Sequence, residues 1–257
     1  MQPQTHPTFS DLHYRVRRDE LAALAIHVEP ARIEYTDDEH ATWRRVRARI
    51  DPLHRKHACA EVLAAQREVP LSSTTIPQLA EVSAMLARAS GFRLAPVAGL
   101  VPARPFFAAL ARGVFLATQY VRHPSSPLYT PEPDVIHELV GHVALLADPR
   151  IAELARACGA FAAIADDTRL GRLERVFWFA LEFGCCREAG EVRALGAGLL
   201  SSVGELENAM DRARWRAWDL DAMAQHDYGT TDYQADLFVA PDFDTLVSDV
   251  AAWLRTA

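Results

Sequence analysis

The stretch from 133 to 146, PDVIHELVGHVALL, places two histidines and a glutamate inside a segment that is otherwise apolar enough to be buried. A single histidine in such a segment is usually a core residue whose ring is satisfied locally. Burying two imidazoles and a carboxylate costs free energy unless each group finds a partner, and a metal ion is one such partner. The segment therefore predicts a polar site inside the core, built from His137, Glu138 and His142.

The spacing of the two histidines limits which site this is. His137 and Glu138 resemble the start of the HExxH motif of zinc peptidases, in which the second histidine follows at i+4. Here the second histidine is His142, at i+5, and an ideal helix would rotate it by about 140° from the first. Gly141 can relax the backbone through a helix end or a local bulge. This spacing argues against a zinc hydrolase, which stays an alternative interpretation.

A third ligand is expected among acids in apolar surroundings. Glu182 is the sole charge in VFWFALEFGCC (176–186), a stretch that is apolar on every helical face. A buried carboxylate without a partner costs several kcal/mol, so it must pair with a base, take up a proton or bind a metal. Two imidazoles and one carboxylate with open positions suit non-haem Fe(II) that activates O2. The residues alone predict a metal site and leave the metal open.

Two other side chains are candidates for binding a substrate. Arg122 follows an uncharged stretch and could hold a carboxylate through a two-pronged hydrogen-bonded pair. The alternative is a surface arginine that caps the end of a helix. Trp178 lies at i−4 from Glu182 and so shares its helix face, although aromatic residues there are more often core packing.

Bulk composition excludes several classes of partner. The chain has 257 residues, half of them hydrophobic and 24% charged, which fits one sizeable domain. Its net charge of −7 argues against a nucleic-acid or anionic-membrane partner. We see neither a signal peptide nor a membrane span, and the four cysteines show no CxxC spacing. These features predict a cytoplasmic protein with free thiols.

The pattern of the chain predicts a mainly α fold with a few short strands, because alanine and leucine dominate and alternating runs are nearly absent. Expected helices lie at 76–90, 106–121 and 167–187 and at the C-terminus. Others follow the capping boxes Thr36–Glu39 and Ser202–Glu205 and the pairs Thr130–Pro131 and Asp148–Pro149. Expected loops are 91–105, with a short extended piece, 122–133, and the glycine-rich LGAGLLSS; TDYQADLFVA is expected to be a strand.

Three long motifs carry a resemblance to a known family. YTPEPDVIHELVGHVALLADP, RVFWFALEFGCC and LGAGLLSSVGEL closely resemble the pterin-dependent aromatic amino acid hydroxylases, and the likeness runs from IEYTDDEHATW to TDYQADLFVA. It implies one basket-shaped catalytic domain over residues 1–257, with about residues 1–10 flexible. It also implies a monomer without a regulatory domain or a tetramerisation helix. The implied cofactors are Fe(II) and a tetrahydropterin (tetrahydrobiopterin or a bacterial analogue), with O2 as co-substrate.

The resemblance also assigns roles by matching motif positions. It implies three iron ligands, His137, His142 and Glu182, with Glu138 as a further catalytic residue facing the pterin. The implied pterin-binding residues are Gly99, Val101, Ala103, Phe106, Glu138 and Phe177. The implied substrate-binding residues are Arg122, Thr130 and Ser201 for the carboxylate and Pro133, Trp178, Phe183 and Gly198 for the ring.

Two positions bear on which amino acid is hydroxylated. Trp178 matches the phenylalanine and tyrosine branches of the family, and its bulk leaves less room for an indole substrate. Thr230 stands where tyrosine hydroxylases carry an acid and animal phenylalanine enzymes an apolar residue. The prediction is a phenylalanine 4-monooxygenase that makes L-tyrosine. Alternatives are hydroxylation of tryptophan, hydroxylation of phenylalanine at another ring position, and more remotely a zinc hydrolase.

Overall fold

The computed structural model describes residues 6–26, 29–230 and 232–257 and shows a mainly helical chain with short strands. The expected fold class is confirmed. Within the described residues, no helix combines the length and apolar character needed to cross a bilayer. Of the first ten residues, which were expected to be flexible, 1–5 lie outside the described part and Pro7–Ser10 form a short helix, α1.

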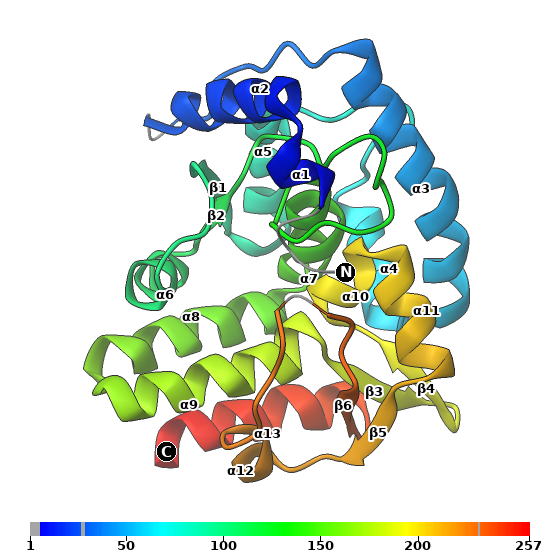
Figure 1. Ribbon diagram of the computed structural model, residues 1–257. Coiled ribbons are helices and arrows are strands. Elements are labelled where there is room, and N and C mark those ends of the chain that lie inside the picture. The colour runs from blue at the N-terminus through cyan, green and yellow to red at the C-terminus, as the bar shows by residue number, and fades with distance from the viewer. Residues whose placement is uncertain (1–5, 27–28, 231) are drawn as a thin grey trace.

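The helical segments follow one another over most of the chain. They are α1 Pro7–Ser10, α2 Leu12–Ala23, η2 Leu24–Ile26, α3 Asp37–His57, α4 Ala60–Glu68, α5 Leu79–Ser90, α6 Ala103–Ala111, η3 His137–His142, α7 Val143–Leu146, α8 Pro149–Ile164, α9 Asp167–Phe177, η4 Trp178–Glu182, α10 Ala197–Ser201, α11 Val203–Asp211, α12 Leu220–Met223 and α13 Phe243–Thr256. Figure 1 shows α3 along one edge of the molecule, α8, α9 and α13 across its base, and α7 near the middle.

The strands form two small sheets. They are β1 Arg93–Pro96, β2 Val114–Ala117, β3 Cys185–Glu188, β4 Glu191–Ala194, β5 Arg214–Ala217 and β6 Asp236–Ala240. β1 and β2 pair in parallel, and the other four take the order β4-β3-β6-β5 with only the β3–β4 pair antiparallel. That hairpin turns at Ala189 and Gly190, both with positive φ. The sheets are too small to form the core, so the helices supply most of it.

Several local predictions are confirmed. Thr36 and Glu39 close a full capping box at the start of α3, and Gly91 ends α5 in the left-handed conformation. Asp148 caps α8, directly before Pro149. The extended piece expected within 91–105 is β1, the strand expected in TDYQADLFVA is β6, and the C-terminal helix is α13. Each of these signals is local to the element it specifies.

The helix expected at 106–121 is wrong. Helix α6 ends at Ala111, Gly113 takes a positive φ of 69°, and the next residues form β2. Strand β2 pairs with β1, so Leu94 lies opposite Phe115. A strand so short is stabilised by its partner and by burial, and neither is visible in a local helical periodicity.

The helix start expected at Thr130–Pro131 is also wrong. The helical segment begins after Asp134, whose Oδ1 accepts the His137 N–H at 3.0 Å. The Thr130 hydroxyl donates instead to the carbonyl of Glu132 at 2.8 Å. Pro133 gives the reason, because a residue that precedes proline avoids the α conformation and Glu132 precedes it.

Two further boundaries differ from the prediction. The helix expected at 167–187 ends at Glu182. Gly184 then lies so close to the carbonyl of Ala180 that no side chain would fit there, and the chain continues into β3. The loop expected at LGAGLLSS contains α10, all of whose residues are buried.

The second capping box is only half formed. Ser202 caps α11 by accepting the Glu205 N–H at 3.3 Å, as predicted. The Glu205 carboxylate does not return this bond and instead accepts the Gln234 N–H at 3.2 Å. A residue expected to stabilise its own helix therefore contacts a distant segment.

Candidate metal centre

The i+5 spacing of the two histidines is accommodated by a π-helical turn. Across His137–His142 the Val143 N–H bonds the carbonyl of Glu138, five residues back, which is the pattern of a π turn. Such a turn brings residues five apart to the same side, and the two Nε2 atoms lie 3.0 Å apart. The local bulge expected at Gly141 is confirmed. This glycine packs directly against the carbonyl of Ala197 in α10.

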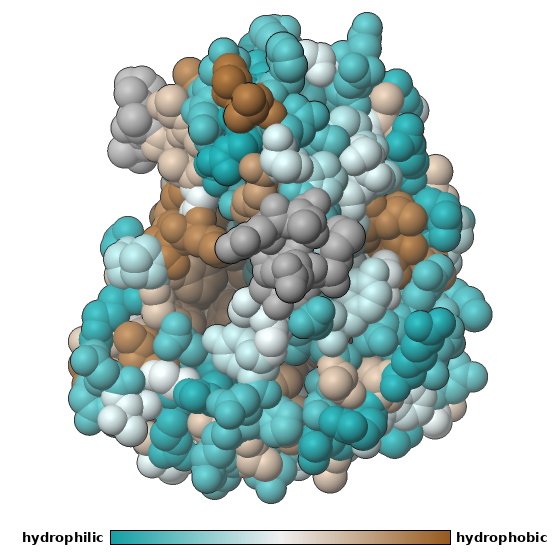
Figure 2. All heavy atoms as spheres, viewed as in Figure 1, coloured by the Kyte–Doolittle hydropathy of each residue, from teal (hydrophilic) through white to brown (hydrophobic). Residues whose placement is uncertain are grey.

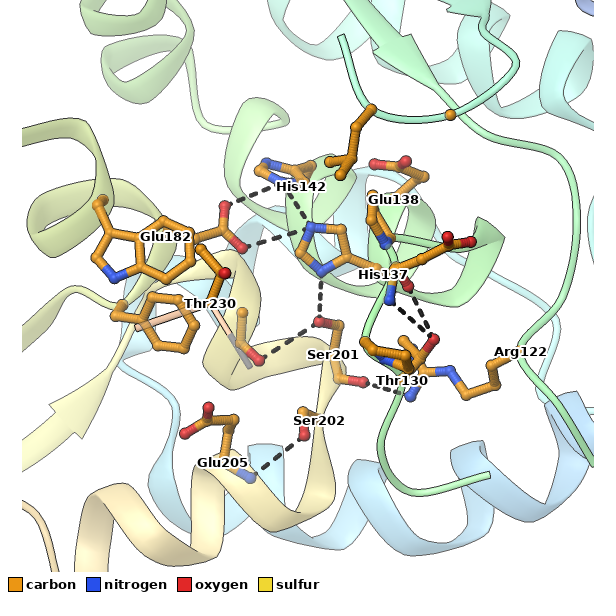
Figure 3. Close-up of a pocket in the computed structure, with 18 of the residues that line it drawn as sticks. Arg122, Thr130, His137, Glu138, His142, Glu182, Ser201, Ser202, Glu205 and Thr230 are labelled. Carbon is orange, nitrogen blue, oxygen red and sulfur yellow. Dashed lines mark hydrogen bonds and ion pairs between the residues drawn. The ribbon is translucent and has the colours of Figure 1, made fainter. Parts of the chain in front are cut away.

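A second π turn carries the acid. Across Trp178–Glu182 the Phe183 N–H bonds the carbonyl of Trp178 at 2.8 Å. The Glu182 carboxylate points at both imidazoles, with Oε1 3.4 Å from His137 Nε2 and Oε2 3.2 Å from His142 Nε2 (Figure 3). The structure therefore brings the three predicted ligands together from two helical segments.

The spacing of these donor atoms fits a metal ion. Bonds of about 2.1 Å at right angles would place neighbouring donors about 3.0 Å apart. The observed separations are 3.0, 3.2 and 3.4 Å. The two carboxylate distances run to different oxygens of Glu182, and all three side chains line a cavity. Two imidazoles and a carboxylate in this arrangement are the donor set of non-haem iron.

Glu138 is a competing acid at this centre. A ligand atom of its carboxylate lies within 4.8 Å of those of His137 and His142. Its Oε1, however, accepts the N–H of Thr118 at 3.1 Å and the hydroxyl of Thr118 at 3.0 Å. We favour Glu182 as the third donor because both of its oxygens face the imidazoles. Burial raises the pKa of Glu138 to about 7, although the Thr118 bonds oppose this shift.

Burial and charge set the protonation of the donors. Burial lowers the pKa of His137 to about 4, so this imidazole is neutral at pH 7. Its Nδ1 lies 2.9 Å from Ser201 Oγ, and an N–H donated there leaves the Nε2 lone pair free for a metal. Burial raises the pKa of Glu182, but the two imidazoles outweigh burial and hold this pKa below its usual value.

A cavity of about 420 Å³ adjoins the three donors, a size typical of small-molecule sites. Figure 2 shows a recess with hydrophobic walls on one face of the molecule. The predicted site residues that line the cavity are Gly99, Val101, Phe106, Arg122, Thr130, Pro133, His137, Glu138, His142, Trp178, Glu182, Phe183, Gly198 and Ser201. Ala103 and Phe177 are not among its lining residues. The Phe177 ring packs edge-on against Phe106, with 5.7 Å between centroids.

Aromatic rings form one wall of this cavity. The Trp178 indole stacks on Tyr228 at 4.3 Å and lies 4.7 Å from the ring of Phe183. Its Nε1–H donates to Gln234 Oε1 at 3.1 Å, so the indole is fixed on both its face and its edge. Neither Tyr228 nor Gln234 was singled out from the sequence, since both come from a segment more than 40 residues away along the chain.

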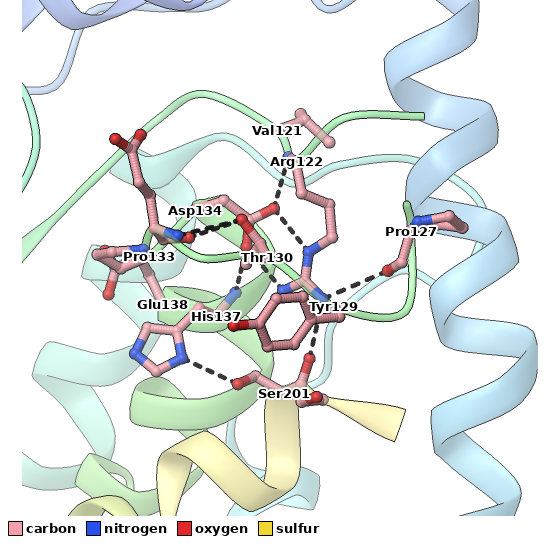
Figure 4. Close-up of polar contacts among 12 residues, drawn as sticks. Val121, Arg122, Pro127, Tyr129, Thr130, Pro133, Asp134, His137, Glu138 and Ser201 are labelled. Atoms are coloured by element: carbon pink, nitrogen blue, oxygen red, sulfur yellow. Dashed lines mark hydrogen bonds and ion pairs between the residues drawn. The ribbon is translucent and has the colours of Figure 1, made fainter. Parts of the chain in front are cut away.

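Arg122 is buried rather than exposed, so the helix-capping alternative is wrong. Its Nε and Nη2 donate to the two oxygens of Asp134 at 3.0 and 2.7 Å, and its Nη1 donates to the carbonyls of Pro127 and Ser201 (Figure 4). Four of its five N–H groups are thus used inside the protein. Sequence reasoning missed Asp134, although an acid beside Pro133 in a buried segment was a usable signal.

Comparison with known proteins now decides the family. A model of the biopterin-dependent aromatic amino acid hydroxylases matches residues 2–257. The chain belongs to this family. Among curated relatives of this chain, tyrosine 3-monooxygenase of Drosophila melanogaster is 44% identical over 98% of the chain and 45% of its own length. Phenylalanine-4-hydroxylase of Rattus norvegicus is 39% identical over 98% of the chain and 57% of its own length.

Solved structures of bacterial phenylalanine hydroxylases share the fold of this chain. The Chromobacterium violaceum enzyme, which has bound iron(III) and 7,8-dihydrobiopterin, superimposes with a TM-score of 0.84 at 29% identity over 93% of this chain and 90% of that one. The Legionella pneumophila enzyme gives 0.82 at 31% identity over 90% and 92%. The chain spans about half the length of the curated relatives it matches. The predicted family is confirmed, and its dependence on biopterin agrees with the expected cofactor.

Proposed function

We propose that this hydroxylase converts L-phenylalanine to L-tyrosine, with iron held by His137, His142 and Glu182. The observation that carries the proposal is the Glu182 carboxylate, whose two oxygens face the Nε2 atoms of His137 and His142 beside the cavity. The iron bound by the C. violaceum enzyme supports it. When bound, ferrous iron would activate O2 and a tetrahydropterin would supply two electrons, so that one oxygen atom enters the ring and the other ends as water. The side chains hold and orient these groups and exclude water.

The proposed pterin site lies beside the metal centre. Gly99, Val101 and Phe106 line the cavity and offer backbone groups and a ring for stacking. Glu138, with its pKa near 7, can hold a proton at the carboxyl oxygen that Thr118 does not contact. We keep Ala103 and Phe177 in this set as supporting positions. Ala103 is the first residue of α6, and Phe177 packs behind Phe106.

The proposed substrate site joins a polar end to an aromatic wall. Arg122, Thr130 and Ser201 would bind the carboxylate, and Pro133, Trp178, Phe183 and Gly198 would enclose the ring. Because Asp134 and two carbonyls already use most of its donors, Arg122 would contribute one Nη2–H rather than a free two-pronged clamp. The Gly198 position suits this enclosure, since a Cβ there would overlap the ring of Phe183.

The character of the aromatic wall favours phenylalanine over tyrosine. The rings of this wall are apolar apart from one indole N–H, which is already bonded to Gln234. A phenolic hydroxyl buried there without a partner would cost about 1–3 kcal/mol. Hydroxylation of tyrosine is the second candidate, because curated tyrosine 3-monooxygenases are 44% identical and the Thr230 hydroxyl also lines the cavity.

The test is hydroxylation of each aromatic amino acid by the iron-loaded protein with a tetrahydropterin and O2. We expect phenylalanine to be used with a kcat/KM at least about tenfold above that of tyrosine or tryptophan, and NMR of the product to place the hydroxyl at the para carbon. Faster formation of dihydroxyphenylalanine from tyrosine would support the second candidate. If none of the three amino acids is hydroxylated, the proposed function is wrong. Peptide cleavage by a zinc-loaded sample would then identify the protein as a zinc hydrolase.

The organisation of the chain is part of this proposal. We infer that residues 1–257 work as one catalytic domain, which the family match over residues 2–257 supports. A monomer in the cytoplasm with only small-molecule partners stays a prediction. Light scattering of the purified chain would check the monomer.

A further inference from the structure

Glu205 is a buried acid that neither the metal nor the proposed pterin site uses. It lies in the first turn of α11 with 6% of its surface exposed and lines the same cavity as Arg122. Its Oε2 accepts the Gln234 N–H at 3.2 Å. Within the described part of the chain, no hydrogen bond to Oε1 is formed and no lysine, arginine or histidine pairs with this carboxylate.

Two other acids of this region, Glu182 and Asp134, differ from Glu205 in having such partners, and a third, Glu138, accepts two hydrogen bonds from Thr118 at a single oxygen. Glu182 faces two imidazoles, and Asp134 is paired with the guanidinium of Arg122 at 2.7 Å. A buried carboxylate without a cation is unfavourable, and the cost is relieved when a cationic ligand occupies the adjoining space. Glu205 lines the cavity, so a positively charged ligand bound there can reach its carboxylate.

We propose that Glu205 binds the ammonium group of the amino acid substrate. The inference rests on the proposed function, because it assumes that the cavity takes an aromatic amino acid. An amino acid carries its ammonium and carboxylate groups on one carbon atom, so a site that recognises both needs a cation and an anion close together. Arg122 bonds the carbonyl of Ser201, and Glu205 follows Ser201 by four residues.

Figure 3 draws Arg122 and Glu205 on either side of the Ser201–Ser202 segment, with the cavity between them and the metal donors. Ser202 fixes the start of α11 and hence the position of Glu205, since it caps the Glu205 N–H. The Arg122 guanidinium is thus bonded to the same short stretch of backbone that carries Glu205. This arrangement selects a primary α-ammonium beside a carboxylate and gives no advantage to a ligand without the ammonium group.

The competing explanation is that Glu205 only anchors the segment that carries Gln234. Glu205→Gln separates the two roles, because its amide oxygen can still accept the Gln234 N–H while the negative charge is lost. Glu207→Gln is the matched control. Glu207 is an exposed acid two residues further along the same helix, paired at 3.8 Å with Arg49.

The experiment measures the binding of L-phenylalanine and of 3-phenylpropanoate, which lacks the ammonium group, to the iron-loaded protein without O2. Calorimetry gives the Kd of each ligand for the wild type and both variants. We expect Glu205→Gln to weaken L-phenylalanine binding about tenfold or more, to change 3-phenylpropanoate binding less than about twofold, and Glu207→Gln to change neither. An equal loss for both ligands in Glu205→Gln, or no loss for L-phenylalanine, overturns the inference.

A comparison within the wild type keeps the test independent of how well the variant folds. L-phenylalanine must bind more tightly than 3-phenylpropanoate, and equal affinities overturn the role of Glu205. If the wild type hydroxylates phenylalanine but shows no such preference, only the ammonium site fails. If the wild type neither binds nor hydroxylates any aromatic amino acid, both the proposed function and this inference are wrong.

Discussion

At the scale of single residues, two glutamates, Glu138 and Glu182, lie beside the histidines of the candidate metal centre, but their hydrogen-bond partners differ. Glu138 is adjacent in sequence to His137, yet a threonine uses one of its oxygens. Glu182 comes from another helical segment, and both of its oxygens face imidazoles. Contact, rather than proximity in sequence, decides which acid is suited to bind a metal.

This difference can be tested by removing each charge in turn. We expect Glu182→Gln to lower Fe(II) affinity more than roughly a hundredfold, because a neutral amide replaces a direct ligand, and Glu138→Gln to change it by less than about threefold. Competition with a chelator under anaerobic conditions measures both affinities. Glu138→Gln should instead reduce hydroxylation at saturating iron. The reverse order of iron affinities would assign the third ligand to Glu138.

At the scale of elements, the two π turns are what bring the donors together. The first was foreseen because an i+5 spacing of two buried histidines cannot be met by a regular helix. The second had no such signal, since Glu182 is a lone acid in its stretch. Caps such as Thr36–Glu39 could also be predicted, because their partners lie within four residues. Strand β2 could not, because its partner β1 is about 20 residues away.

Gly141 offers a test of how tightly the first π turn packs. In Gly141→Ala the new Cβ would lie 2.5 Å from the carbonyl oxygen of Ala197, so α10 would have to shift. We expect a loss of about 1–3 kcal/mol in the free energy of unfolding, measured with urea. Gly171→Ala in α9 is the control, because its Cβ would meet nothing closer than Arg175 at 3.6 Å and should stabilise the helix slightly. Equal effects of the two substitutions would show that the contact with α10 is unimportant.

His54 connects α3 to α10 and makes stability depend on pH. Its Nε2 lies 2.7 Å from the carbonyl of Leu200, and Gln66 donates to its Nδ1 at 3.0 Å. Burial lowers the pKa of His54 in the folded protein to about 4, whereas an unfolded chain has a value near 6.5. Between these values only the unfolded state takes up the proton. The stabilisation present above pH 6.5 is therefore lost as the pH falls towards 4.

The expected loss from His54 alone is about 3 kcal/mol across that window, from roughly 1.4 kcal/mol per pKa unit. His54→Gln removes this titration, so its free energy of unfolding should fall less steeply between pH 6.5 and pH 4 than that of the wild type. Urea unfolding at several pH values measures both slopes. Parallel slopes would mean that His54 is protonated in the folded protein as readily as in the unfolded one.

At the scale of the whole molecule, the cavity is assembled from segments that are distant in sequence. Residues around 97–106, 129–142, 178–183, 198–205 and 230–234 all line it. Motif resemblance identified most of these positions. The Arg122–Asp134 pair and the Glu205–Gln234 contact were missed, because each depends on how loops pack against helices that the local pattern does not place.

Iron should act as a crosslink for the whole molecule. A ligand that binds only the folded state raises the free energy of unfolding, by about 4 kcal/mol at a thousand times its Kd. We expect chelation to lower the Tm by roughly 5–15 °C, measured by calorimetry without O2. The same treatment of Glu182→Gln should produce little change. An unchanged Tm of the wild type would mean that the donors are held in place equally well without the ion.

The Arg122–Asp134 pair affects how strongly anions can bind in the cavity. Asp134 already neutralises the charge of Arg122, so the guanidinium offers an entering ligand one oriented N–H donor and little net positive potential. Chloride, phosphate and other inorganic anions of the cell would find little there to hold them. The carboxylate of an amino acid would likewise be held at Arg122 by one directed hydrogen bond rather than by a net positive charge.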